Sequence, residues 1–274
     1  MERAEARDPG RPDEAGRAPE GLVARDPAAA RSEPGPNSPA EEEREEAAGV
    51  RLSAIIPTWQ EEARIGRAVA GARAIADEVV VSDGGSTDRT AAIARAEGAL
   101  VLQEGRGRGQ QLMAGAARAS GDVLLFLHAD TVLPPEARAA VERALQDPGV
   151  SGGNFFLRFE PRDAPVGRLF TWLYDLRCRL LRIYYGDSPL FVRTAVYWRL
   201  GGFPAQPLFE DYAFIRRLEG SGGTVYVRDV EAVTSGRRYE NHVLRTLGTW
   251  VILQTLYSLG ASPARLARWY VDAR

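Results

Sequence analysis

Short apolar segments alternate with helix-like segments in the part of the chain that runs from residue 50 to residue 127. Residues 123–127 are consecutive apolar residues, which is typical of a strand buried on both faces. Strands that alternate with helices of about ten residues form βαβ units, and such units build a parallel sheet. We therefore expect an α/β fold in which helices flank a mostly parallel sheet. The strands are predicted at 50–56, 78–82, 99–102 and 123–127, with helices between them at 63–75, 87–97 and 110–119.

The pattern changes after Pro134, where strands and helices no longer alternate regularly. We predict one domain at 49–240, with a first half at 49–133 and a second half at 134–240, followed by a C-terminal helical extension at 241–274. In the second half, helices are predicted at 136–145, 166–181, 194–200 and 210–219, and strands at 150–160, 188–193 and 224–233. The extension is predicted to hold two apolar helices, at 241–259 and 263–271.

Residues 1–48 differ from the rest of the chain in composition and charge. They carry 13 acidic and 7 basic side chains, a net charge of −6, and few large apolar groups. Such a segment cannot bury enough surface to offset its ordering entropy, so we expect a disordered tail that is not a signal peptide. The other residues carry 24 acidic and 28 basic side chains, a net charge of +4. That charge suits an anionic small substrate and is too weak to indicate nucleic acid.

Lysine is absent, so all 35 basic side chains are arginine, and histidine occurs only at positions 128 and 242. The absence of lysine excludes a Schiff base, a P-loop lysine and a lysine general base. Arginine keeps its proton, so these residues can only bind and orient anions. Two histidines exclude a multi-histidine zinc centre. Cys178 is the only cysteine, so no intrachain disulfide can form and a reducing, cytoplasmic compartment is expected.

Polar residues follow directly after the predicted strand at 123–127, at His128 and Asp130. The carboxyl edge of an open α/β sheet is where ligands bind. A carboxylate at that edge is well placed to hold a divalent cation against a diphosphate. The alternative interpretation is that Asp130 only caps the turn that precedes Pro134 and Pro135.

Two further motifs follow the first and second predicted strands. Pro57, Thr58 and Glu61 come after the first strand, where a proline ends the ladder of hydrogen bonds. Asp83 precedes two glycines after the second strand, and these let the backbone turn sharply and approach a ligand. The alternative for the first motif is an ordinary strand end followed by an acidic helix start. For the second motif it is a strand end followed by a capped helix, although capping alone does not account for Asp83.

Charged residues at six later positions could also contact a ligand. Arg108 lies in the glycine-rich segment 105–109, which we expect to be a flexible loop that can hold phosphate oxygens or simply be solvated. Glu210 and Asp211 open a predicted helix, where a carboxylate can accept a proton from a hydroxyl or merely complement the helix dipole. Asp187, Arg237 and Arg238 complete the set: the aspartate could touch an acceptor hydroxyl or cap a turn, and the arginines could clamp a diphosphate or lie on the surface.

The order and spacing of these motifs resemble family 2 of the inverting nucleotide-sugar glycosyltransferases, which have the GT-A fold. More narrowly, the His-Ala-Asp-Thr segment and the Arg-Arg-Tyr segment at 237–239 are similar to a bacterial "family 2-like" subgroup of radical-SAM/selenodomain-associated transferases. The resemblance covers about residues 50–240. It rests on Pro57-Thr58-x-x-Glu61-Glu62, Asp83-Gly-Gly-Ser-Thr-Asp88, Phe126-Leu-His-Ala-Asp130, Gly201-Gly-Phe-Pro204 and Glu210-Asp211.

The resemblance implies a nucleotide-sugar donor, a hydroxyl acceptor and a role for each matching residue. Asp211 would be the general base and Asp130 would bind Mg²⁺ or Mn²⁺ at the diphosphate. The expected nucleoside contacts are Pro57, Thr58, Glu61 and Asp83, and the second half of the domain would bind the acceptor near Asp187 and Glu210. Contacts of Arg108, Arg237 and Arg238 with the diphosphate are our inference rather than a property of the family.

The chain departs from the family at His128, where most members have the first aspartate of an Asp-x-Asp motif. An imidazole ligates Mn²⁺ acceptably but suits Mg²⁺ poorly. We therefore expect His128 and Asp130 to be the metal ligands, either with lower affinity for the metal or with arginines taking over some of the charge neutralisation.

Two other functions compete with a glycosyltransferase. A sugar-1-phosphate nucleotidyltransferase would need a glycine-rich loop after the first strand and usually a lysine, which this chain lacks. A non-catalytic nucleotide-sugar-binding scaffold would keep the fold and lose turnover. The C-terminal helices could form core or lie on the inner face of a membrane and present a lipid-linked acceptor. Their apolar segment at 247–261 is shorter than the ~18 residues of a membrane span.

Overall fold

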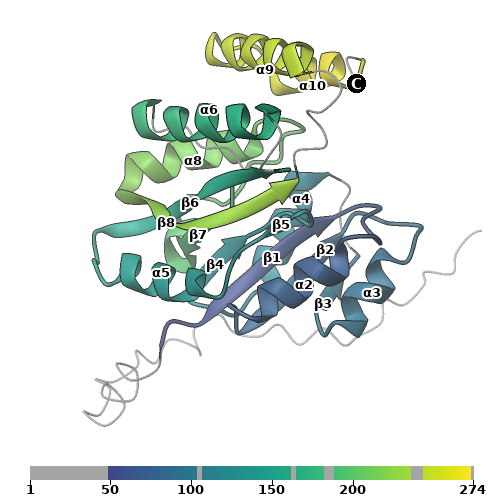
Figure 1. Ribbon diagram of the computed structural model, residues 1–274, viewed down its shortest axis with the longest axis vertical. Helices are drawn as coiled ribbons and strands as arrows, with labels where there is room; N and C mark the ends of the chain where they lie inside the picture. The colour runs from purple at the N-terminus through teal and green to yellow at the C-terminus, as the bar shows by residue number, and fades with distance from the viewer. Residues whose placement is uncertain (1–48, 104–106, 162–164, 182–187, 236–242, 273–274) are drawn as a thin grey trace, which may run out of the picture. The chain divides into compact units, whose positions relative to one another are not determined.

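The computed structural model describes residues 49–103, 107–161, 165–181, 188–235 and 243–272 (Figure 1). The predicted disordered tail at 1–48 lies outside the described residues, as do Asp187, Arg237 and Arg238.

A parallel sheet forms the first half of the fold, as the alternating pattern predicts. Strand β1 (Leu52–Thr58) pairs in parallel with β2 (Glu78–Asp83) and with β4 (Val123–Phe126), and β2 pairs in parallel with β3 (Leu100–Leu102). Helices connect the strands: α2 (Ile65–Arg73), α3 (Thr90–Ala96) and α4 (Arg108–Arg118). Both faces of β1 and β4 are buried, which explains their continuous apolar runs.

The second half extends the same sheet with antiparallel pairs. The strand order is β3-β2-β1-β4-β7-β6-β8-β5. Strand β7 is antiparallel to both β4 and β6, whereas β6 and β8 are parallel with two register shifts. The strands are β5 (Thr131–Val132), β6 (Val150–Glu160), β7 (Leu190–Arg193) and β8 (Gly223–Ser235), and the helices are α5 (Glu136–Leu145), α6 (Pro165–Leu181), α7 (Thr194–Arg199) and α8 (Glu210–Ser221).

Two element boundaries differ from the prediction for identifiable reasons. Strand β1 does not stop at Pro57 but continues through it, with Pro57 opposite Ser82 and Thr58 opposite Asp83. The missing N–H of Pro57 costs nothing there, because β4 ends opposite Ile55 and no partner strand lies on that side. The predicted flexible loop is also shorter, since Arg108 is the first residue of α4 rather than a loop residue.

The short strand β5 was not predicted, because two residues are too few to show a periodic pattern. It pairs antiparallel with β8, and the Thr131 hydroxyl lies 2.9 Å from that of Thr234. The five residue steps from Phe126 in β4 to Thr131 span at most about 18 Å. Because three strands separate β4 from β5 in the sheet order, the sheet must curl to bring β8 back towards the end of β4.

Apolar side chains of both halves form one main core, and a second cluster joins α8 to the C-terminal helices. In the main core Phe126, Tyr197, Phe203 and Phe214 make a set of tilted and edge-to-face ring contacts with centroids 4.8–5.6 Å apart. In the second cluster α9 (Val243–Ser258) and α10 (Pro263–Asp272), together called the C-terminal helix pair, pack against Phe209. Within the described residues, no helix has the length and apolar character needed to cross a bilayer.

Candidate active site

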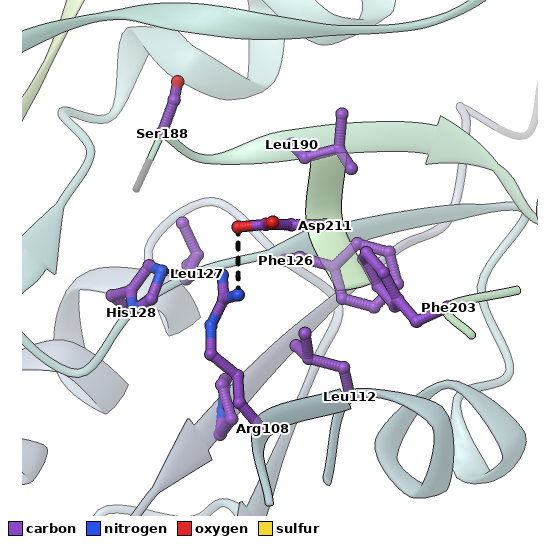
Figure 2. A pocket seen from close by; sticks show the side chains of 10 residues that line it. Arg108, Leu112, Phe126, Leu127, His128, Ser188, Leu190, Phe203 and Asp211 are labelled. Carbon is purple, nitrogen blue, oxygen red and sulfur yellow. Dashed lines mark hydrogen bonds and ion pairs between the residues drawn. The ribbon is translucent and has the colours of Figure 1, made fainter. Parts of the chain in front are cut away.

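A small cavity lies at the carboxyl ends of β1 and β4, where the sequence places its polar residues (Figure 2). Its volume of about 10 Å³ is roughly the room that one water molecule needs. Polar and charged groups are contributed by Arg108 of α4, His128 after β4, Asp211 of α8 and Ser188. The apolar wall consists of Pro57, Leu112, Phe126, Leu127, Leu190 and Phe203.

Arg108 connects three segments that are far apart in the chain. Its Nη1 atom lies 2.5 Å from Oε1 of Glu210 and 3.1 Å from Oδ2 of Asp211. Its Nη2 atom lies 3.1 Å from Nε2 of His128. Figure 2 shows the guanidinium between the imidazole and the Asp211 carboxylate. The structure thus brings three other predicted site residues together around the Arg108 cation.

Glu210 is almost completely buried, with 5 % of its surface exposed. Burial raises the pKa of the Glu210 carboxyl, and the Asp211 charge acts in the same direction. The Arg108 guanidinium lowers this pKa, but burial is the larger effect. Arg108 therefore provides the charge compensation that a carboxylate in this position requires.

The ends of β1 and β2 are joined by a glutamine that the sequence did not single out. The Gln111 side chain, 6 % exposed, donates to the carbonyl oxygens of Thr58 and Ser82, with both distances 2.7 Å. It thereby links the two carbonyl groups at a buried sheet edge, one of which, that of Thr58, also accepts the N–H of Gly84. The available signal was a long polar residue beside Leu112 on the apolar face of α4, three residues after Arg108.

Asp83 is fully buried, and its carboxylate caps the turn that follows β2. One oxygen accepts hydrogen bonds from the Ser86 hydroxyl at 2.5 Å and, more weakly, from Thr58 at 3.4 Å. The other oxygen accepts the Ser86 N–H at 3.0 Å. This capping accounts for Asp83 structurally, so its contact with a nucleobase stays a prediction.

Glu61 and Asp130 do not line the cavity. Glu61 forms an ion pair with Arg64 at 2.7 Å, and its backbone N–H donates to the Thr90 hydroxyl. Asp130 is partly exposed and lies directly before β5, with the Thr131 hydroxyl 3.5 Å from its Oδ1. Of the two predicted metal ligands, His128 therefore lines the cavity and Asp130 does not.

The residues around Asp130 fit a divalent cation only in part. Among the described residues, no group of three or more His, Cys, Asp and Glu side chains forms a metal site. Mg²⁺ is nevertheless commonly held by one or two carboxylates together with substrate phosphates, and Asp130 can supply one. His128 fits less well, because its Nε2 faces the Arg108 guanidinium. Ligation by His128 stays a prediction.

A parallel half-sheet that continues into antiparallel strands, with charged groups at the carboxyl edge of its central strands, defines the class of GT-A folds. The mannosyltransferase PcManGT from Pyrobaculum calidifontis, solved with GDP-Man and Mn²⁺, matches with a TM-score of 0.59 at 22 % identity, over 79 % of this chain and 67 % of that one. Glucosyl-3-phosphoglycerate synthase from Mycobacterium tuberculosis, solved with Mn²⁺, UDP-glucose and phosphoglyceric acid, matches with a TM-score of 0.55 at 21 % identity, over 81 % and 84 % of the two chains.

The chain belongs to glycosyl transferase family 2, whose model matches residues 53–195. An undecaprenyl-phosphate 4-deoxy-4-formamido-L-arabinose transferase from Pseudomonas paraeruginosa is 34 % identical over 140 residues, which are 46 % of this chain and 40 % of that protein. The M. tuberculosis glucosyl-3-phosphoglycerate synthase is 32 % identical over 100 residues, 32 % of this chain and 31 % of that protein. The chain thus matches less than half the length of these relatives. The family assignment is confirmed, whereas the narrower subgroup stays a prediction.

Proposed function

We propose that the protein transfers a sugar from a nucleoside-diphosphate sugar to an acceptor hydroxyl, with inversion at the anomeric carbon. The single observation that carries this proposal is the ion-paired cluster at the carboxyl edge of the sheet. There Arg108 contacts Asp211, in the first turn of α8, and His128, two residues after the end of β4. Membership of glycosyl transferase family 2 supports the reaction class.

Asp211 is the proposed general base. It takes the proton of the acceptor hydroxyl while that oxygen forms a bond to the anomeric carbon. The bond from the anomeric carbon to the diphosphate oxygen breaks in the same step, and the electron pair leaves with the nucleoside diphosphate. One displacement inverts the configuration and needs no covalent enzyme intermediate. Before the substrates bind, Arg108 holds this carboxylate through Oδ2 at 3.1 Å.

The donor diphosphate is proposed to bind between Arg108 and Asp130. The guanidinium would exchange a carboxylate contact for diphosphate oxygens, which it can bind in a bidentate manner. A divalent cation held by Asp130 and the diphosphate oxygens would offset the charge of the leaving group. The nucleoside is proposed to contact Pro57, Thr58 and Asp83 at the ends of β1 and β2.

One observation favours a second candidate, a scaffold that binds the donor without turnover. Arg108 engages Asp211 directly, and the cavity beside it has a volume of only about 10 Å³. A scaffold would keep this ion pair when the donor binds, whereas an enzyme must open it to admit an acceptor.

The variant Asp211→Asn tests the function. It keeps the shape of the side chain and removes the base, so we expect turnover to fall at least ~10²-fold. Donor binding should change little, because Asp211 is proposed to act on the acceptor. A thermal shift with and without Mn²⁺ measures donor binding, since a bound donor stabilises the fold by mass action. The matched variant Asp130→Asn should instead remove the Mn²⁺-dependent part of the donor shift. Near-normal turnover of Asp211→Asn would exclude Asp211 as the base, and donor binding without turnover by the wild type would identify a scaffold.

The acceptor is proposed to be lipid-linked and reached at an anionic membrane surface. The C-terminal helix pair exposes Val251, Ile252 and Trp269 at 65 %, 58 % and 56 % of their surfaces. Arg245 and Arg268 are exposed on the same helices, which suits acidic headgroups. A relative named for undecaprenyl phosphate supports this class of acceptor.

A further inference from the structure

Phe209, the residue immediately before Glu210 and Asp211, has a backbone conformation that phenylalanine rarely adopts. It occupies the N-cap position of α8 with φ of 62° and ψ of 22°, in the left-handed region. Bulky residues adopt positive φ only when the surrounding structure compensates for the strain. The Phe209 carbonyl accepts the N–H of Ala213 at 2.9 Å, so this strained residue also sets the first turn of the helix.

The compensation comes from the C-terminal helix pair. The Phe209 ring is 3 % exposed and is buried with Leu253 of α9 and Leu266 of α10, which are 3 % and 1 % exposed. Its centroid lies 4.7 Å from that of Tyr257 and 6.5 Å from that of Trp250. Side chains from both terminal helices therefore enclose the ring.

The same helices also contact the residue on the other side of the carboxylates. The ring of Tyr212 lies 5.9 Å from that of Tyr257, with the planes 79° apart. Glu210 and Asp211 are thus flanked in the sequence by two aromatic residues that both pack on Tyr257. The carboxylates themselves turn the other way, towards Arg108.

We propose that Phe209 is a positioning residue and that the C-terminal helix pair aims the proposed catalytic base through it. The helix pair holds the Phe209 ring, the ring holds the left-handed backbone, and that backbone directs the first turn of α8 towards Arg108. The catalytic effect of this inference rests on the proposed function. The structural coupling between the helix pair and the start of α8 does not depend on that function.

Two substitutions of Phe209 separate the role of the backbone from that of packing. Phe209→Ala removes the ring and keeps a residue that is strained at positive φ, whereas Phe209→Gly removes the ring and relieves the strain. If Phe209 mattered only for packing, glycine would be as harmful as alanine or worse. We expect Phe209→Ala to lower kcat about tenfold or more with the donor KM nearly unchanged. Phe209→Gly should retain a higher kcat than Phe209→Ala.

A matched pair of leucines tests the role of the helix pair at a distance from the carboxylates. Leu266→Ala opens the second apolar cluster, whereas Leu259→Ala changes a side chain that is 79 % exposed. We expect only Leu266→Ala to lower kcat. By hydrogen exchange in the full chain, only Leu266→Ala should speed exchange of the amides at 210–213.

The outcomes distinguish this inference from the proposed function. If the wild type transfers no sugar, the function is wrong, yet the exchange measurement still decides whether the helix pair holds α8. Equal exchange at 210–213 in Leu266→Ala and the wild type would overturn the inference. A kcat of Phe209→Gly at or below that of Phe209→Ala would overturn it as well.

Discussion

The pKa values of two carboxyl groups in the same domain, Glu78 and Glu210, are shifted in opposite directions. Burial raises the pKa of Glu78, but hydrogen bonds donated by the Ser53 hydroxyl and by the N–H and hydroxyl of Ser120 outweigh it, so the pKa is lowered. At Glu210 burial prevails over Arg108 and the pKa is raised. A lowered carboxyl pKa stabilises the fold at neutral pH, whereas a raised one costs stability there.

Glu78→Gln and Glu210→Gln should therefore change the pH dependence of stability in opposite directions. Glu78 contributes stability above its unfolded pKa, near 4.5, which is lost as the pH falls through the folded value. We expect Glu78→Gln to lower the free energy of unfolding by about 1 kcal/mol at pH 7, with a smaller deficit in acid. For Glu210, stability falls as the pH rises above 4.5 through the folded pKa. The free energy of unfolding of Glu210→Gln should thus increase relative to that of the wild type as the pH rises.

Urea unfolding at a series of pH values measures both effects. Each glutamine variant serves as the control for the other, because the two substitutions make the same chemical change. If both variants ran parallel to the wild type at every pH, neither carboxylate would carry the proposed shift.

At the level of single residues, the sequence identified charged groups but not their partners. Asp211, Glu210, His128 and Arg108 were all predicted as site residues, and they lie around one cavity or one ion pair. That Arg108 would contact the carboxylates of α8 could not be predicted, because this contact depends on how α4 and α8 pack. Its contact with a diphosphate stays a prediction. Gln111 was missed because its position beside Leu112 on the apolar face of α4 was the only local signal, and the two carbonyl groups that it contacts belong to strands β1 and β2.

At the scale of secondary-structure elements, α4 packs so closely on β1 that one helix position requires glycine. A Cβ on Gly115 would lie 2.5 Å from Cγ2 of Ile55, whereas a Cβ on Gly220 of α8 would meet nothing within 4 Å. Glycine in a helix is otherwise unfavourable by about 1 kcal/mol relative to alanine. Close approach of the helix to the sheet therefore explains Gly115, and it carries the start of α4, with Arg108, to the edge of the sheet.

We expect Gly115→Ala to lower the free energy of unfolding by about 1 kcal/mol, because overpacking outweighs the gain in helix propensity. Gly220→Ala, the matched control, should raise it by about 0.5–1 kcal/mol. Thermal or urea unfolding of both variants measures the difference. A stabilised Gly115→Ala would show that the α4–β1 contact relaxes without cost.

Most elements could be predicted because their signals are local. Helix α5 and strand β6 have the predicted bounds, at Glu136–Leu145 and Val150–Glu160, and the other predicted elements in the described regions differ only at their ends. The end of β1 was misjudged, since whether Pro57 breaks a ladder depends on where the neighbouring strand stops. Strand β5 exists only through its pairing with β8, so no local pattern could reveal it.

At the scale of the whole molecule, some side chains of the C-terminal helix pair pack against the domain and others are exposed. Leu253 and Leu266 are buried on Phe209, whereas Val251, Ile252 and Trp269 remain exposed. Isolated exposed apolar residues are ordinary, but apolar and cationic residues on one pair of helices suit an anionic bilayer.

We therefore expect the full-length protein to co-sediment with vesicles that contain acidic phospholipid and not with neutral vesicles, and we expect salt to weaken binding. Trp269→Ala should weaken binding several-fold through lost apolar burial. The matched control is Trp198→Ala, whose side chain is 42 % exposed on α7. Equal binding of the wild type to neutral and acidic vesicles would contradict the electrostatic part of this prediction.

The hydroxyl contact between Thr131 and Thr234 has a consequence for how the protein is made in the cell. It joins residues that are 103 positions apart, and the pair of Arg108 with Glu210 is 102 positions apart. A nascent chain that has not reached residue 210 has no acidic partner for Arg108 from α8. One that stops before residue 234 lacks the residue of β8 that pairs with Thr131, next to Asp130. Products that end before residue 210 would thus carry the parallel strands β1 to β4 and still be unable to assemble the proposed catalytic centre.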